Sequence, residues 1–119
     1  KVGVTGLETT LPLLLTEVMR GRLLIADIAR LLAEKPAQIF DIKGKGFLEQ
    51  ENDANLTIID LRRKSKIDAS KFKSKAKFSP FDGREVEGLP VKTFVGGQLV
   101  MDEGEIVAKA GSGRIIRRA

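Results

Sequence analysis

The sequence predicts an α+β fold, with helices in the first third of the chain and strands in the remainder. Apolar residues recur at helical spacing from Leu7 to Val18 and again from Leu24 to Glu34. From Phe47 onward the pattern changes to β-branched and large apolar runs that are separated by glycine turns. No alternation of helix and strand is present, and 119 residues make at most one small domain.

The first predicted helix follows a glycine turn made by Gly3 and Gly6. Thr5 and Glu8 have the T-x-x-E spacing of a capping box. Pro12 either kinks this helix or begins a fresh one, since a missing N–H costs little in a first turn. The helix is apolar on most of its circumference and therefore expects neighbours on several sides. Together with a start at Lys1 instead of methionine, this favours a piece of a larger protein.

A second helix is predicted from about Leu24 to Glu34. Pro36 ends this helix at or before Lys35, or opens a further short turn that closes near Asp41. The segment KGKG that follows, residues 43–46, has two lysines and two glycines but lacks the spacing of a phosphate-binding loop. We expect it to be a plain connection between helix and strand.

Two segments of the second half predict strands. LTIIDL, residues 56–61, is rich in β-branched and large apolar residues and predicts a buried strand. Residues 91–108 contain the two-residue turns Gly96-Gly97 and Glu103-Gly104 between apolar runs. Glycine supplies the positive φ of tight hairpin turns, so these residues predict a three-stranded meander.

The positive charge of the chain is concentrated in one basic segment, residues 62–77, which holds eight basic side chains and one acidic. Such a segment can follow a nucleic-acid backbone. Only one aromatic residue, Phe72, interrupts it, so platforms for stacking bases are lacking. We favour instead the solvated face of an extended edge segment, on which the following side chains alternate. The four alternating lysines are Lys71, Lys73, Lys75 and Lys77.

Composition excludes several classes of chemistry for the chain taken alone. It has no cysteine and no histidine, so disulfides, thiol chemistry, the usual zinc ligands and the usual general base near neutral pH are absent. No apolar run approaches the roughly 20 residues of a membrane span, and no signal peptide is seen. We expect no catalytic residue and no metal ligand in this chain, and a cytoplasmic location.

The chain contains, in order, the segments GVTGLETTLPLLL, KPAQIFDI, NDANLTIIDL and SKAKFSPFDGREVEGLPVKTFVGGQLV. Together they resemble the C-terminal third of dihydroorotases, zinc cyclic amidohydrolases of pyrimidine biosynthesis. The resemblance runs from Gly3 to about Gly113, and its most particular element is the first segment. Three departures from the family pattern are Leu24 in place of a Ser or Thr helix cap, Asp41 in place of glycine, and Asn55 in place of aspartate.

This resemblance implies a division of the chain between two domains of a complete enzyme. Residues 1–42 would be the last helices of a TIM-type barrel, and residues 43–119 the C-terminal strands of a small β-sandwich, with the meander at about 91–108. Zinc would be bound upstream of Lys1. The complete enzyme would reversibly hydrolyse the cyclic amide of dihydroorotate to N-carbamoyl-L-aspartate, whereas this chain alone would be inactive.

One site residue lies in the chain by the same resemblance. The loop Lys1-Val2-Gly3 would contact substrate through its backbone at Gly3, although the glycines can equally serve only to build the turn. The implied partners are the upstream barrel portion and a small-molecule substrate, with a homodimer compatible with the full enzyme; a membrane is not implied, nor is nucleic acid. Three alternatives stay open: a hydantoinase or allantoinase, an inactive dihydroorotase-like subunit, and a basic nucleic-acid-binding module that uses residues 62–77.

Overall fold

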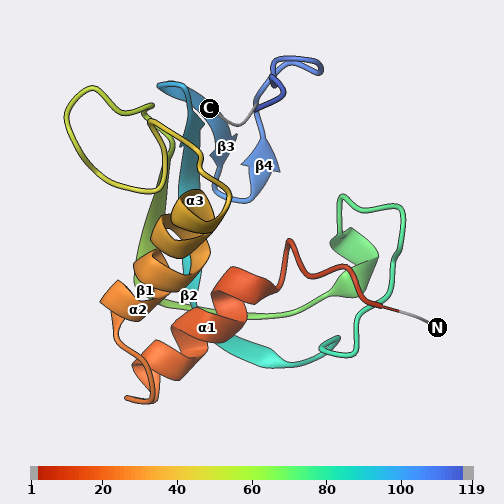
Figure 1. The fold of residues 1–119 in the computed structure, drawn as a ribbon. Helices are drawn as coiled ribbons and strands as arrows, with labels where there is room; N and C mark the ends of the chain where they lie inside the picture. The colour runs from red at the N-terminus through yellow and green to blue at the C-terminus, as the bar shows by residue number, and fades with distance from the viewer. Residues whose placement is uncertain (1–2, 117–119) are drawn as a thin grey trace. The chain divides into compact units, whose positions relative to one another are not determined.

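The structure, a computed structural model, describes residues 3–116 and confirms the α+β prediction. The four strands form one sheet in the order β1-β2-β3-β4 (Figure 1). Helices occupy the first third of the chain and strands the rest, as expected. In chain order the elements are α1 (Thr10–Met19), α2 (Ile25–Ala29), the π-helix η1 (Arg30–Glu34), α3 (Lys35–Ile39), β1 (Leu56–Lys66), the 3-10 helix η2 (Ala69–Lys71), β2 (Glu85–Val95), β3 (Gln98–Asp102) and β4 (Glu105–Ile106).

The chain divides into two compact units, each built from two separate segments. The first unit combines the residues up to Leu23 with Asp60–Leu89, and the second combines Leu24–Ile59 with the residues from Pro90 on. The chain passes from one unit to the other within β1 and within β2. The predicted division at residue 42 refers to domains of a complete enzyme and stays a prediction.

In the first unit, α1 begins at Thr10, so Pro12 is its third residue. The first amides of an α-helix have no acceptor within the helix, and a proline at this place therefore costs little. The amides of Thr9 and Thr10 donate instead to the Gly6 carbonyl, at 3.1 and 2.9 Å. The structure thus favours the alternative in which a fresh helix begins near Pro12. The helix begins at Thr10, two residues before the predicted start.

The predicted capping box between Thr5 and Glu8 is wrong. The helix begins five residues after Thr5, and the Thr5 hydroxyl, itself buried, has no hydrogen-bond partner among the described residues. The Glu8 carboxylate reaches a segment far along the chain, which is described below. The T-x-x-E spacing was present, but the hydrogen bonds of the Gly6 carbonyl set the start of the helix one turn later.

Helix α1 packs on β2 through one buried leucine and one threonine hydroxyl. Leu15 is 0% exposed, and a Cβ added at Gly88 (φ +90°) would lie 2.7 Å from the Leu15 Cβ, so only glycine lets the two elements approach this closely. The Thr16 hydroxyl accepts a hydrogen bond from the Glu87 amide at 3.0 Å. A small core completes this unit. Its buried members are Ile67, Ala69, Phe72 and Val86.

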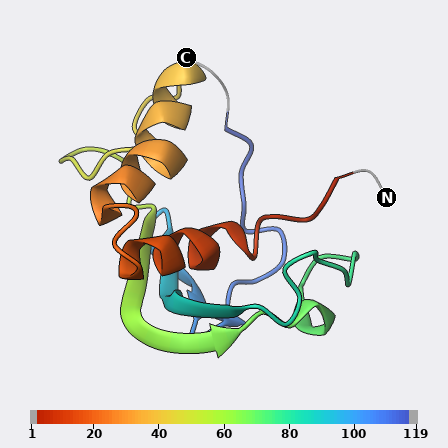
Figure 2. The same ribbon diagram turned by 90° about the horizontal axis from the view of Figure 1, so that it is seen from below.

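In the second unit the helical chain continues through Pro36, and the prediction that Pro36 ends the helix is wrong. Elements α2, η1 and α3 follow one another without a break from Ile25 to Ile39 and form the orange rod of Figure 2. In the π-helix η1, the Lys35 amide donates to the Arg30 carbonyl five residues back. This wider turn accommodates the proline ring and its missing N–H, which a regular α-helix would not.

The end of α3 agrees with the alternative prediction that Pro36 opens a further turn that closes near Asp41. Asp41 has φ +52°, the left-handed conformation that usually selects glycine after the end of a helix. The Ile42 amide donates to the Ala37 carbonyl at 2.9 Å and the Asp41 amide to the Gln38 carbonyl at 3.3 Å, which is the pattern of a Schellman motif.

The start of α2 compensates for its unusual cap. Leu24 offers no side-chain acceptor, but its own amide donates to the Asp27 carboxylate at 3.0 Å. This hydrogen bond is the first cause of the lowered pKa of Asp27, followed by the hydrogen bond from Arg30. The KGKG segment that follows the helices is a connection, as expected, and its Lys45 Nζ lies 2.6 Å from Asp53 Oδ2.

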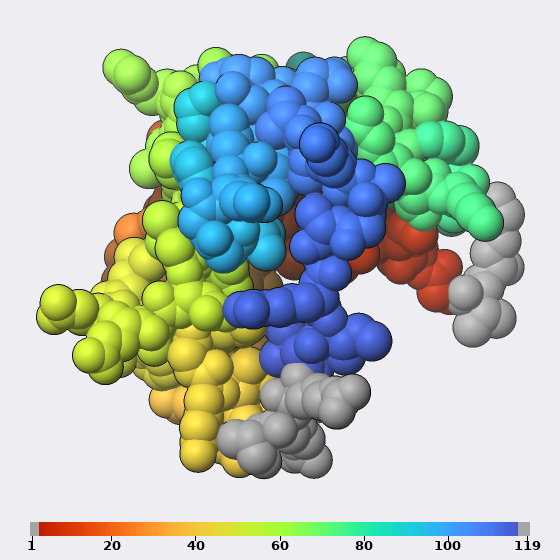
Figure 3. All heavy atoms as spheres, turned by 90° about the horizontal axis from the view of Figure 1, so that it is seen from above, coloured from red at the N-terminus to blue at the C-terminus, as the bar shows by residue number. Residues whose placement is uncertain are grey.

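The predicted meander is confirmed. Strands β2 and β3 pair antiparallel with Val95 opposite Gln98, and β3 pairs with β4 with Asp102 opposite Glu105. All four turn residues have positive φ, between +50° and +86°, as type I′ hairpin turns require. The first turn is further held by Asn55, whose side-chain oxygen accepts from the Gly96 amide at 2.8 Å. Figure 3 shows the meander in blue on the molecular surface.

The strand at LTIIDL is confirmed, but its predicted burial is wrong for this chain. β1 covers these residues and continues to Lys66. Leu56 and Ile58 are exposed, and the next three residues are half-buried. Apolar strand residues normally pack against other residues, but the described part of this chain leaves Leu56 and Ile58 exposed.

Candidate functional site

The predicted substrate loop leads into α1, and the structure describes one of its three residues. Lys1 and Val2 lie outside the described residues. Gly3 is exposed, has φ +78°, and an added Cβ would meet no atom within 4 Å. The positive φ strains any residue that carries a Cβ. The backbone groups of Gly3 can therefore be approached closely by a small molecule, and a side chain at this position would project into the open space.

The residues after Gly3 are tied to α1 through one carbonyl. The Gly6 carbonyl accepts from the amides of Thr9 and Thr10 and also from both of their hydroxyls, at 3.3 Å for Thr9 and 2.8 Å for Thr10. This cluster of donors fixes the turn to the first turn of the helix. Thr9 is buried, so the turn lies against the body of this unit.

Sequence reasoning missed the principal contact of this loop, which is made by Glu8. Its Oε1 accepts from the Lys73 amide at 2.9 Å and from the Ser74 amide at 3.2 Å, and its Oε2 lies 3.1 Å from the Lys73 amide. Figures 1 and 3 show the green segment around residues 70–80 beside the red N-terminal segment. The partners are 65 and 66 residues away, and no local spacing indicates them.

The basic side chains of residues 62–77 are exposed, but the prediction that the four alternating lysines follow an extended edge is wrong. Lys71 ends the 3-10 helix η2, and the other three lie in the loop after it. The extended part is Arg62–Lys66, the second half of β1, at one edge of the sheet. A 3-10 turn forms because the Asp68 carboxylate accepts from the amide and the hydroxyl of Ser70.

Several charges of this segment are compensated within it. The Ser70 hydroxyl and then Lys71, whose Nζ lies 3.3 Å from Asp68 Oδ2, lower the pKa of Asp68. Lys77 Nζ donates to the Phe72 carbonyl. Phe72 itself is buried, so the aromatic ring of the segment is not available to stack on a base.

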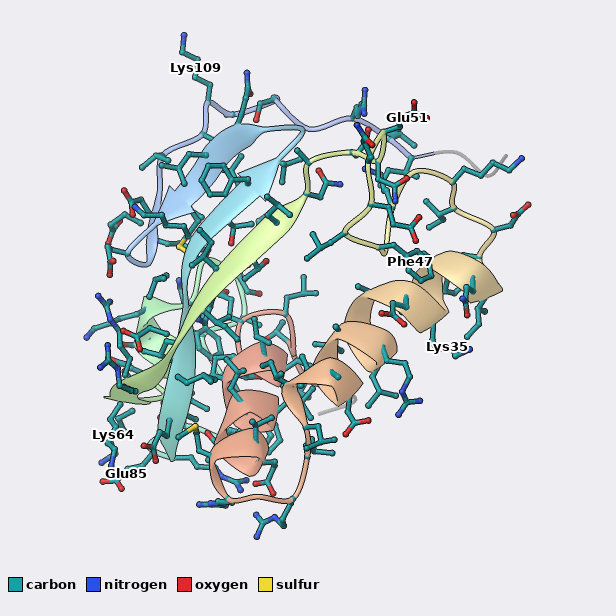
Figure 4. All side chains as sticks on the ribbon, turned by 90° about the vertical axis from the view of Figure 1, so that its left-hand side faces the viewer. Lys35, Phe47, Glu51, Lys64, Glu85 and Lys109 are labelled. Atoms are coloured by element: carbon teal, nitrogen blue, oxygen red, sulfur yellow. The ribbon has the colours of Figure 1, made fainter. Side chains whose placement is uncertain are left out.

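A depression of about 400 Å³ lies next to the basic segment, between α1 and the paired ends of β1 and β2. Figure 4 shows two of its lining residues, Lys64 and Glu85, at the same end of these strands. Three of its charged lining residues are in ion pairs, since Lys64 Nζ lies 3.6 Å from Glu87 Oε1 and Arg20 pairs with Glu17 at 3.2 Å. We assign no ligand to this depression.

The side chains do not fit the zinc ion that the resemblance implies. Within residues 3–116, no three side chains of the His, Cys, Asp or Glu types come together to hold a metal ion. Zinc sites in proteins are built mainly from imidazole and thiolate, neither of which occurs in the sequence. In the same described range, no helix has the length and apolar character needed to cross a membrane.

Comparisons with known proteins extend over nearly the whole chain, although no family model matches it. The chain is 45% identical over 118 residues to an L-hydantoinase of Paenarthrobacter aurescens, and 44% identical over 114 residues to a dihydroorotase of Methanothermobacter thermautotrophicus. These matches cover 98% and 96% of the chain. Each covers 26% of the relative, so the chain spans about a quarter of the length of these proteins.

The fold gives the same result as the sequence. The structure of an L-hydantoinase (dihydropyrimidinase) from Arthrobacter aurescens matches 98% of this chain with a TM-score of 0.94 and 45% identity. The match covers 26% of that structure, at its C-terminal end. The helices and strands described above thus recur together in a solved cyclic amidohydrolase, and the sequence similarity does not separate hydantoinases from dihydroorotases.

Proposed function

We propose that this chain, which corresponds to the C-terminal quarter of a cyclic amidohydrolase of the hydantoinase and dihydroorotase family, works as part of a complete enzyme that hydrolyses a cyclic amide. The observation that carries the proposal is the 45% identity over 98% of the chain, together with a TM-score of 0.94 to a solved hydantoinase. The partner of the chain is then the upstream barrel portion of the same enzyme.

Exposed apolar side chains support such a partner in each compact unit. In the first unit, Leu7 in the turn before α1 is 99% exposed, and Val4 and Met19 are also exposed. In the second unit, the helical run from Ile25 to Ile39 buries only Ile28 and Ala37. Its exposed apolar residues, with those that flank it, are Leu24, Ile25, Leu31, Leu32, Ile39 and Phe40. Apolar surface of this extent is typical of an interface.

Within the complete enzyme, the contribution of this chain to substrate binding is the backbone at Gly3. The residue has the positive φ and the open surroundings that a close backbone contact with a small molecule needs. A backbone N–H can donate to a carboxylate or a ring carbonyl of the substrate, and such a bond to a charged group is worth about 1.5–3 kcal/mol. The chain supplies no proton donor or acceptor to the reaction.

The metal belongs to the upstream portion in this proposal. By the resemblance to dihydroorotases, zinc supplies the activation of water in the complete enzyme. The side chains described here form no set of ligands for it, and we route no step of the reaction through this chain. Taken alone, the chain is expected to be inactive.

Dihydroorotate is the first candidate substrate. The opening segment GVTGLETTLPLLL resembles dihydroorotases in particular, and dihydroorotases from several archaea are 38–44% identical to the chain. The reaction would be the reversible hydrolysis of the ring amide to N-carbamoyl-L-aspartate. A hydantoin is the second candidate, because an L-hydantoinase has an equal identity and a high structural similarity.

Assays of the complete enzyme separate these candidates. The upstream portion is joined to Lys1, and the purified protein is given dihydroorotate, hydantoin and dihydrouracil in turn. We expect loss of dihydroorotate absorbance and formation of the carbamoyl product. Turnover of hydantoin without dihydroorotate would establish the second candidate, and no turnover of any cyclic amide would refute the proposed function.

A further inference from the structure

We propose that Glu8 is a positioning residue for substrate binding, acting by holding the loop at Gly3 through its bonds to the backbone of Lys73 and Ser74. The inference rests on the proposed function, since it needs Gly3 to contact substrate. Glu8 itself touches no reacting atom. It uses a carboxylate to fix one segment of the first compact unit to another that lies 65 residues later in the chain.

The carboxylate of Glu8 is bound by two successive amides. The Lys73 amide lies 2.9 and 3.1 Å from its two oxygens, and the Ser74 amide lies 3.2 Å from Oε1. Backbone amides that converge on one anion form a concave site for negative charge, and hydrogen bonds to a charged acceptor are stronger than neutral ones. Glu8 is exposed, so packing does not hold its side chain in place and these bonds are its anchor.

The segment that receives Glu8 is itself held in place. Phe72, which directly precedes Lys73, is one of the buried residues of the core. Its amide donates to the Ala69 carbonyl at 3.3 Å, and its own carbonyl accepts from Lys77 Nζ. The Ser74 hydroxyl accepts from the Ala76 amide at 3.3 Å. Although the loop after η2 is exposed, these contacts therefore hold its backbone in place.

The loop at Gly3 is connected to Glu8 by a short and ordered path. The donors of Thr9 and Thr10 fix the Gly6 carbonyl to the first turn of α1, and Glu8 lies in the turn between them. At the middle of α1, the Thr16 hydroxyl and the Glu87 amide hold the helix on β2. Loss of the Glu8 carboxylate leaves this second attachment intact and removes the bonds that tie the turn between Gly3 and α1 to the segment at Lys73.

The experiment uses the complete enzyme with Glu8→Ala, Glu8→Gln and Gly3→Val, and the double variant Gly3→Val with Glu8→Ala. The exposed Glu49 in the other compact unit provides the control, Glu49→Ala. We expect Glu8→Ala to lower kcat/KM about three- to tenfold, mainly through KM, because it disturbs a binding contact and no proton transfer. Glutamine keeps one acceptor oxygen, so Glu8→Gln should recover most of the loss.

The double variant distinguishes positioning from plain stabilisation. If Glu8 acts through the loop, removing it from the Gly3→Val enzyme should change kcat/KM by less than about twofold, since the two changes remove one function. Independent, multiplying losses would overturn the inference, as would an unchanged KM in Glu8→Ala. Hydrogen exchange of the Lys73 and Ser74 amides gives a second readout, and unchanged protection in Glu8→Ala would also overturn it. An unsubstituted enzyme that turns over no cyclic amide would instead refute the proposed function, and the positioning role with it.

Discussion

Replacing Gly3 by valine in the complete enzyme is expected to impair substrate binding while it leaves the metal content unchanged. Gly3 has φ +78°, a conformation that costs a residue with a Cβ about 1–2 kcal/mol. Among the described residues, no atom beyond the chain neighbours of Gly3 lies within 4 Å of an added Cβ, so the Cβ itself meets no clash there. Its expected effect is therefore a displaced backbone and a branched side chain in the open space where the proposed substrate contact would be made.

The size of the effect follows from the one contact that is lost. A hydrogen bond from a backbone amide to a charged group contributes about 1.5–3 kcal/mol, so kcat/KM should fall roughly ten- to a hundredfold. Gly3→Ala introduces the same backbone strain with a smaller side chain and should show a smaller loss. The resemblance places the zinc ligands upstream, so the zinc content measured after dialysis should be the same in every variant.

Gly6→Ala is the matched control in the same turn. Its added Cβ would lie 3.3 Å from the Thr10 hydroxyl oxygen, close enough to disturb a hydrogen bond but not the main chain. The expected change in the free energy of unfolding is at most about 1 kcal/mol, since alanine also restricts the unfolded chain. Steady-state kinetics and thermal unfolding of the three variants test this. If Gly3→Val left kcat/KM unchanged, or if Gly3→Val and Gly6→Ala affected only the melting temperature, the glycines would merely build the turn.

Three further predictions concern the elements around this loop. Gly88→Ala should clearly lower the melting temperature of the complete enzyme, because the residue has positive φ and the added Cβ would lie only 2.7 Å from the Cβ of buried Leu15. Gly113→Ala is the control and should leave the melting temperature unchanged, because no described atom lies within 4 Å of its added Cβ. Replacing the four alternating lysines by glutamine should leave turnover nearly unchanged. Binding of single-stranded or duplex nucleic acid to the unsubstituted protein should be weak and lost at moderate salt. Sub-micromolar binding at physiological salt that these substitutions remove would favour the nucleic-acid-binding module. The lowered pKa of Asp27 means that its carboxylate stabilises the start of α2 above the ordinary pKa of 3.8, and that this contribution is lost as the pH falls through the lowered value. Unfolding followed from pH 7 to pH 3 should therefore show a smaller acid destabilisation in Asp27→Ala, and parallel curves would contradict this assignment.

Local features of the fold were predictable from the sequence because neighbouring residues determine them. The turns Gly96-Gly97 and Glu103-Gly104 need positive φ at both central residues, and their flanking apolar runs can pair only as a meander. These inferences depend on residues within or next to each turn.

Features that depend on distant residues were not predictable in this way. The Glu8 carboxylate could accept from amides at its own helix start or from those of Lys73 and Ser74, and only the fold brings the latter within 3.2 Å. Pro36 normally ends a helix, but a π-helix before it lets the helical run continue, and nothing in RLLAE signals that change. The apolar composition of LTIIDL predicted a buried strand, but Leu56 and Ile58 are exposed, because burial depends on what packs against a strand and not on its own composition.

The most direct test of the account is to measure cyclic amide hydrolysis with the upstream barrel portion and this chain, separately and together. Each part alone is expected to be inactive, and this chain alone to retain no zinc after dialysis. The two parts joined or co-expressed should bind zinc and hydrolyse dihydroorotate or a hydantoin. Full activity of the barrel portion without this chain, stoichiometric zinc on this chain alone, or an inactive assembly on every cyclic amide would contradict the account.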